Sequence, residues 1–94
     1  MPPRELVWSR AAIEEFQGFL SRRVHKEAVL AEVEQHLLAV AADPTLARLS
    51  GGPLRELIYR FHCKDGDSTI FMLAVFAYSP PNQLAVIRCG TQPL

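Results

Sequence analysis

Three side chains that could act on a phosphate ester recur at every second position of one short segment. Arg60, His62 and Lys64 alternate there with apolar residues, in the run "RELIYRFHCK" at residues 55–64. Side chains two residues apart on a β-strand point to the same face, roughly 7 Å from one another. Imidazole transfers protons near neutral pH, and flanking cations can stabilise charge on a phosphate. The spacing therefore predicts a catalytic row in which His62 is the acid–base group between Arg60 and Lys64.

Three further side chains are candidates for holding a substrate. Arg88 could add a third cation if it points to the same face, and Tyr78 could stack a base. Arg55 could contact nucleic acid, although an ion pair with Glu56 beside the glycine linker is the simpler role. A sheet with one solvated face shows the same alternation of polar and apolar residues, so an ordinary wet surface is the alternative to an active site.

The sequence predicts no metal site and no cofactor. Cys63 and Cys89 lie in apolar runs without Cys-x-x-Cys spacing, and we expect buried free thiols, with a disulfide left open if their strands are neighbours. His25 and His36 are eleven residues apart, whereas a metal-binding pair on a helix is four apart.

Composition limits the partners that the chain can attract. Ten Lys and Arg residues balance ten Asp and Glu residues among 94, so the formal net charge is zero. A polyanion must then be bound by a local patch, because the molecule as a whole exerts no attraction. The length fits a single domain, 1–94. Without an apolar targeting segment or an apolar run of about 18 residues, we expect a cytoplasmic protein that does not contact the membrane.

In the N-terminal half, hydrophobic periodicity predicts a helical hairpin after a short strand at residues 6–8. Apolar residues then recur at spacings of three and four, with Ser9 as the N-cap of the first helix. The second helix is expected to end before Asp43, because Pro44 disfavours helical geometry at the residue ahead of it. A linker with a single helical turn carrying Leu46 and Leu49 follows, and Gly51, Gly52 and Pro53 are expected to end it.

In the C-terminal half, the period changes to two and predicts three strands, at residues 55–64, 69–78 and 83–90, joined by hairpin turns at Asp65-Gly66 and at "SPPN". The nearly unbroken apolar run 69–78 predicts a central strand that is covered on both faces. The expected fold class is α+β in the order β-α-α-β-β-β. It has an antiparallel-rich sheet of about four strands with the helical hairpin on one face, and the partner of the first strand is left open.

Two runs, "VWSRAAIEEFQGFL" and "LARLSGGPLRELIYRF", resemble the RelE/ParE superfamily of bacterial type II toxins. The resemblance covers nearly the whole chain: an opening strand leads into a helical hairpin, and a leucine-glycine linker precedes an arginine-bearing strand. It implies a RelE/ParE-like fold and a toxin that a cognate antitoxin holds inactive. Many relatives cut mRNA on the ribosome without a metal, and others poison DNA gyrase. This chain differs from the RNA-cleaving relatives in its zero net charge and in a tail that has no Arg, Lys, His or Tyr after Arg88.

The resemblance implies one enzymatic function and two non-enzymatic alternatives. The first is a metal-independent mRNA endoribonuclease, for which one group must deprotonate the ribose 2′-hydroxyl and another must protonate the leaving 5′-oxygen. The second is a ParE-like toxin that binds gyrase without chemistry. The third is a catalytically degenerate domain that only binds its antitoxin or forms a homodimer. The histidine between two cations favours the first function, and the neutral charge favours the second.

The helical hairpin carries more apolar residues than one sheet face of a small domain should cover. Leu37, Leu38 and Val40 are the candidate antitoxin-binding residues, as the anchors of an apolar helix face. Self-association through the same surface is the alternative.

Overall fold

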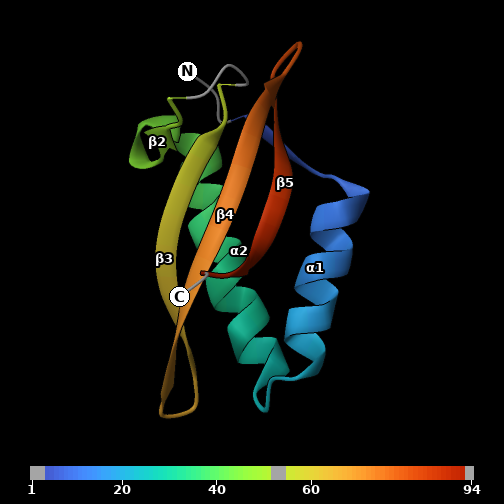
Figure 1. Cartoon of the computed structure of the whole chain (residues 1–94), viewed down its shortest axis with the longest axis vertical. Coiled ribbons are helices and arrows are strands. Elements are labelled where there is room, and N and C mark those ends of the chain that lie inside the picture. Colours follow the sequence, from blue (N-terminus) through green and yellow to red (C-terminus); the bar gives the residue numbers. More distant parts are fainter. Residues whose placement is uncertain (1–3, 52–54, 93–94) are drawn as a thin grey trace.

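The computed structural model describes residues 4–51 and 55–92, and its fold is α+β (Figure 1). The elements in chain order are β1 (Glu5–Trp8), α1 (Arg10–Ser21), α2 (Lys26–Ala42), the 3-10 turn η1 (Pro44–Leu46), β2 (Arg48–Leu49), β3 (Leu57–Asp65), β4 (Ser68–Ser79) and β5 (Gln83–Thr91). The strands form one mixed sheet in the order β1-β5-β4-β3-β2. The expected class and element order are confirmed, with five strands in place of about four.

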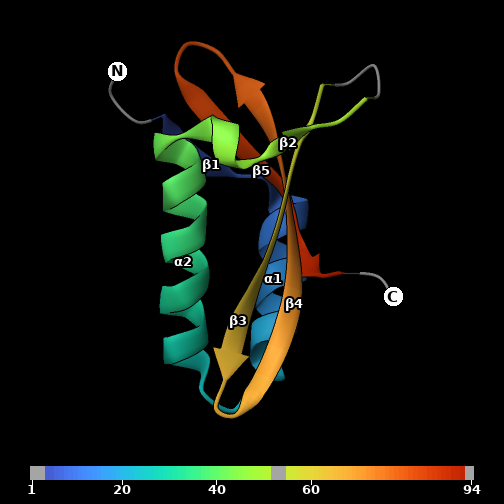
Figure 2. The same ribbon diagram turned by 90° about the vertical axis from the view of Figure 1, so that its left-hand side faces the viewer.

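Both helices lie on the same side of the sheet, and the opposite side carries no helix (Figure 2). α1 packs against β5 and α2 packs against β3. The core between the layers contains Phe16 and Phe19 of α1, four residues of α2, and one face of the three long strands. Its largest fully buried members are Phe76, Leu37, Met72, Leu84, Val29, Val33, Val40 and Val86. The face of the sheet away from the helices is called the open face below.

The ends of the helices follow the capping residues in the sequence. The Ser9 side chain accepts a hydrogen bond from the Ala12 amide at 3.1 Å, as an N-cap does, so this prediction is confirmed. α2 ends at Ala42, immediately before Asp43-Pro44, also as predicted. No helix among the described residues is long and apolar enough to cross a membrane.

Strand pairing answers the question that the sequence left open about the first strand. β1 pairs with β5 in parallel, in the register Leu6 with Leu84 and Trp8 with Val86, whereas the other pairs are antiparallel. β3 and β4 form a hairpin in which Asp65 pairs with Ser68, so the loop is Gly66-Asp67, one residue later than predicted. Gly66 has φ 62°, which a residue without a side chain adopts easily.

Two expectations about the sheet are wrong. The linker after α2 contains the expected helical turn, but Leu49 lies in β2, a two-residue strand that the sequence did not predict. β4 is covered on one face only, because both helices pack on the same side, and Phe71 on its other face is 63% exposed. The predicted glycine-proline break after Ser50 lies partly outside the described residues.

Candidate functional site on the open sheet face

The predicted row of polar side chains lies on the open face of β3. Arg60, His62 and Lys64 are exposed, whereas Phe61 and Cys63 between them are buried against the helices. This alternation places three cationic or titratable groups along one strand, at a spacing of roughly 7 Å. The helices do not cover the row, so a ligand can approach it from solvent.

The neighbouring strand supplies an aromatic ring beside the histidine. Phe71 on β4 is the direct cross-strand partner of His62, and its side chain is 63% exposed. Directly opposite residues of an antiparallel pair have Cβ atoms about 4.5 to 5.5 Å apart. A planar group packed on Phe71 would therefore lie within reach of the imidazole.

Arg60 and Lys64 keep their charges available to a ligand. The salt bridges among the described residues join Arg10 to Glu14 and Arg88 to Glu15, and neither involves the row. The Lys64 ammonium donates a hydrogen bond to the Thr69 hydroxyl at 2.7 Å, which fixes its position without neutralising it. The Glu32 carboxylate accepts a hydrogen bond from the Lys64 amide at 3.1 Å, but neither the Lys64 ammonium nor the Arg60 guanidinium forms an ion pair among the described residues.

Arg88 does not join this row as a free cation. It lies on β5, two strands from β3, which is about 10 Å at the usual strand spacing. Its guanidinium donates a hydrogen bond to the Glu15 carboxylate at 2.9 Å. This hydrogen bond and the charge of Glu15 raise the pKa of Arg88. Its charge is therefore engaged with α1.

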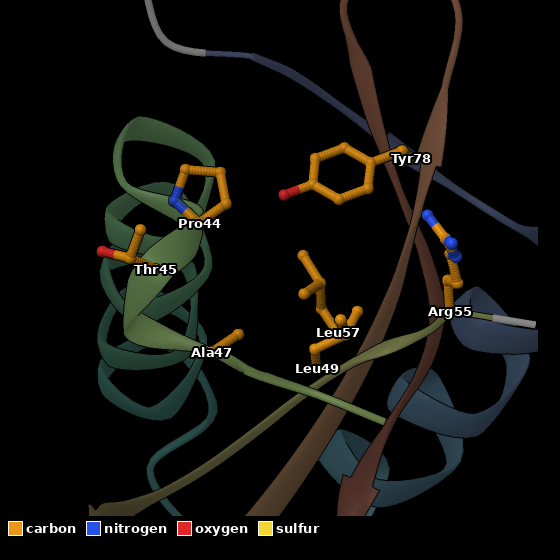
Figure 3. A pocket seen from close by; sticks show the side chains of 7 residues that line it. All are labelled: Pro44, Thr45, Ala47, Leu49, Arg55, Leu57 and Tyr78. Atoms are coloured by element: carbon orange, nitrogen blue, oxygen red, sulfur yellow. The ribbon is translucent and has the colours of Figure 1, made fainter. Parts of the chain in front are cut away.

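Tyr78 and Arg55 lie together, but away from His62. Tyr78 pairs with Leu84, which faces the helices, so its ring lies on the other side of the sheet from the row. It borders a cavity of about 360 Å³ (Figure 3), together with Pro44, Thr45, Ala47, Leu49, Arg55 and Leu57. The Arg4 guanidinium lies 4.6 Å from the ring centroid of Tyr78. The expectation that Tyr78 stacks a base beside His62 is therefore wrong.

The three candidate antitoxin-binding residues do not share a surface. Leu37 and Val40 are completely buried in the core, whereas the side chain of Leu38 is 60% exposed. The sheet covers more of α2 than expected, because α2 packs along β3 (Figure 1). Only Leu38 of the three can contact another protein.

The structure adds two residues that the sequence reasoning missed. Phe71 was assigned to a strand covered on both faces, and Arg48 to a linker. Arg48 is exposed and pairs with Ile58 across β2 and β3, which places it on the same face as Arg60. A strand of two residues leaves no periodic pattern in the sequence, so nothing there predicted that Arg48 lies on the open face.

The two thiols are inert. Cys63 and Cys89 are buried and free, and β4 lies between their strands. Burial raises the pKa of Cys89 to about 12, and burial followed by the charge of Glu32 raises the pKa of Cys63. Both are protonated at neutral pH and poor nucleophiles. Within residues 4–51 and 55–92, no cluster of three His, Cys, Asp or Glu residues could hold a metal ion.

We found no protein-family model, curated protein or solved structure that matches this chain. The function is therefore inferred from the open face and from the resemblance of two sequence runs to RelE/ParE toxins.

Proposed function

We propose that this chain is the cytoplasmic toxin of a type II toxin–antitoxin pair and that its open face binds and cleaves mRNA on the ribosome. One observation carries the proposal: the exposed His62 stands between Arg60 and Lys64, opposite the exposed ring of Phe71. A proton-transfer group, uncompensated cations and a stacking surface are what cleavage of a single-stranded RNA requires.

In the proposed reaction, His62 takes the proton of a ribose 2′-hydroxyl and the 2′-oxygen attacks the adjacent phosphorus. The bond from phosphorus to the 5′-oxygen breaks, which leaves a 2′,3′-cyclic phosphate and a 5′-hydroxyl. The Lys64 ammonium donates the proton that the leaving oxygen needs, and solvent then carries the proton taken up by His62 back to Lys64. Arg60 stabilises the charge on the phosphate oxygens with two parallel hydrogen bonds. Phe71 takes the base-stacking role that was expected of Tyr78.

The antitoxin is proposed to dock between the two helices. Two adjoining cavities of about 240 and 390 Å³ share Trp8 and Glu34. Leu38 borders the first cavity and Ile13 borders the second, and both side chains are partly exposed. An apolar segment of the antitoxin would fill this groove. A second copy of the chain is the competing occupant, and gel filtration with and without the antitoxin distinguishes the two.

A gyrase-binding toxin without enzymatic activity is the second candidate. It is favoured by the zero net charge and by the exposed apolar ring of Phe71 on the open face, because such a ring can anchor a protein partner. Under this alternative the polar row contributes contacts and no chemistry. A catalytically degenerate domain that only binds the antitoxin is the third.

Induced expression with mapping of mRNA ends tests the proposal. We expect growth arrest with in-frame cuts that carry 2′,3′-cyclic phosphates, and a loss of about 100-fold or more in cleavage for His62→Ala. His25→Ala is the matched control, because His25 is exposed and lies in the α1–α2 loop. Cleavage by His62→Ala at the rate of the unchanged chain would overturn the mechanism.

The same experiment separates the alternatives. Growth arrest with intact mRNA and an induced DNA-damage response would indicate gyrase. Normal growth, with tight binding to the product of a neighbouring short reading frame, would indicate the degenerate domain.

A further inference from the structure

A small cavity lies at the edge of the sheet, where the short strand β2 begins. Its volume is about 240 Å³ and it is lined by Leu46, Arg48, Ile58, Tyr59 and Arg60. We call these five residues the edge notch. They come from η1, β2 and β3, so the notch depends on how the chain turns from α2 into the sheet.

The notch exists because β2 is too short to cover β3. β2 pairs only with Leu57 and Ile58, and β3 continues to Asp65 without a strand on that side. Arg48 is directly opposite Ile58, and Arg60 follows Ile58 by two residues on the same face. The end of β2 therefore brings two arginines from different strands to one cavity.

Neither arginine in the notch forms an ion pair with a residue that the structure describes. None of the five lining residues is acidic. Arg10 and Arg88, by contrast, each pair with a glutamate. Two guanidinium groups at one small cavity repel each other until an anion binds between them, and their planar donors match the oxygens of a phosphate.

The other walls of the notch are aromatic and aliphatic. The Tyr59 hydroxyl lies 2.9 Å from Nδ1 of His36, and its ring stacks on Phe61 at 5.3 Å between centroids. These two contacts hold the Tyr59 ring on the helix side of β3, whereas Arg48 and Arg60 lie on the open face, so the notch extends around the edge of the strand. Leu46 and Ile58 add apolar surface, and the side chain of Leu46 is 52% exposed. A ligand that joins a phosphate to a planar group would use both parts of the notch.

We infer that the edge notch binds a nucleoside phosphate. The phosphate lies between Arg48 and Arg60 on the open face, and the nucleoside lies across the edge of β3, against Tyr59 and Leu46. Such a ligand could be a free nucleotide or one unit of an RNA chain. Binding of an RNA chain rests on the proposed function, because Arg60 also belongs to the row on the open face. Binding of a phosphate ester in the notch does not rest on that function.

Titrations followed by amide NMR test this inference with three probes. These are adenosine 5′-monophosphate, inorganic phosphate, and a short 2′-O-methyl oligonucleotide that lacks the hydroxyl needed for cleavage. We expect the nucleotide and the oligonucleotide to shift the amide signals of Leu46, Arg48 and Ile58, and to bind more tightly than inorganic phosphate. Tighter binding of the oligonucleotide than of the mononucleotide would identify RNA as the source, and the reverse would identify the free nucleotide.

Arg48→Gln should weaken nucleotide binding about tenfold or more, the usual loss when a charged hydrogen-bond donor is removed. Arg22→Gln is the matched control, because Arg22 is exposed at the end of α1 and lies outside the notch. Arg48→Lys should bind with intermediate affinity, because it retains the charge but not the paired donors. Since Arg48 is exposed, all three variants should keep the far-UV circular dichroism of the unchanged chain.

Two results would overturn the inference. One is equal weakening by Arg48→Gln and Arg22→Gln, which would show a diffuse charge effect. The other is equal affinity for inorganic phosphate and the nucleotide, which would show that the nucleoside makes no contact. A failure of mRNA cleavage in cells would not alter these binding results, so the two proposals fail separately.

Discussion

A single carboxylate, that of Asp65, ties the α1–α2 loop to the β3–β4 hairpin. It accepts hydrogen bonds from the amides of Val24 at 3.0 Å and of His25 at 2.8 Å. These bonds lower the pKa of Asp65, chiefly through His25 and then Val24. A carboxyl whose pKa is lower in the folded state stabilises the fold above its unfolded pKa of about 3.9. That contribution is lost as the pH falls through the folded value.

Asp65→Ala should therefore lower the urea midpoint of unfolding at pH 7, and the difference from the unchanged chain should shrink once the pH falls below about 4. Asp67→Ala is the control, since Asp67 is exposed in the same hairpin and accepts no side-chain hydrogen bond among the described residues. If Asp65→Ala changes the urea midpoint by the same amount at pH 7 and at pH 3, the charged carboxylate does not stabilise the fold in this way.

At the residue scale, the sequence is sufficient to predict which side chains share a face of the β3–β4 hairpin. Any two-residue hairpin loop pairs even-numbered residues of one strand with odd-numbered residues of the next, and paired residues share a face. His62 must then share a face with Phe71, and Tyr78 must lie on the other. The exposure of Phe71 could not be predicted in this way, because it depends on both helices packing on the same side of the sheet.

At the scale of elements, Glu15 joins α1 to the part of β5 that lies beyond its pairing with β1. β1 pairs with β5 only as far as Val86, which leaves the edge of β5 beyond it without a strand. Glu15 accepts hydrogen bonds from the Cys89 amide and the Arg88 guanidinium, both at 2.9 Å. A Cβ atom at position 90 would lie 2.9 Å from this carboxylate, so Glu15 can approach β5 this closely because residue 90 is a glycine. The helix thus covers a sheet edge that could otherwise pair with another chain.

Glu15→Ala should destabilise the fold by about 1 to 2 kcal/mol, because a partly buried backbone donor loses its charged acceptor. Arg88→Gln should cost less, about 0 to 1 kcal/mol, since it removes only a half-exposed ion pair and leaves the bond to Cys89. Urea unfolding measures both values. Glu14→Ala, whose partner Arg10 is almost fully exposed, should change stability by less than about 0.5 kcal/mol. A smaller loss for Glu15→Ala than for Arg88→Gln would contradict this account.

The longer elements were predictable and the short ones were not. Both helices extend over at least 12 residues and repeat their apolar positions several times, so their pattern is clear without tertiary contacts. β2 has two residues and no periodicity, and it is held only by its pairing with β3. The edge notch therefore could not be predicted from the sequence, whereas the row of Arg60, His62 and Lys64 on β3 could.

At the scale of the whole molecule, one helical layer on one sheet face decides which apolar residues are available to partners. Leu37 and Leu38 are adjacent on α2, yet the first is completely buried and the second is 60% exposed. Truncating a buried leucine costs about 2 to 5 kcal/mol, a large part of the roughly 5 to 15 kcal/mol that stabilises a domain. Loss of partner binding in a Leu37 variant would therefore report unfolding and say nothing about the interface.

Leu38→Lys tests the proposed antitoxin-binding groove, formed by the two cavities that share Trp8 and Glu34, without disturbing the core. We expect its urea midpoint to stay close to that of the unchanged chain, because surface substitutions usually change stability by no more than about 0.5 kcal/mol. Its co-purification with the co-expressed product of the neighbouring short reading frame should be lost, since the lysine places a charge beside Trp8 and the apolar cavity wall. Val24→Lys is the matched control, because Val24 is 81% exposed and lies outside the groove. If Leu38→Lys still co-purifies with this product, the product binds to another surface. If Leu38→Lys elutes as a monomer and the unchanged chain elutes as a dimer, the groove is a self-association site.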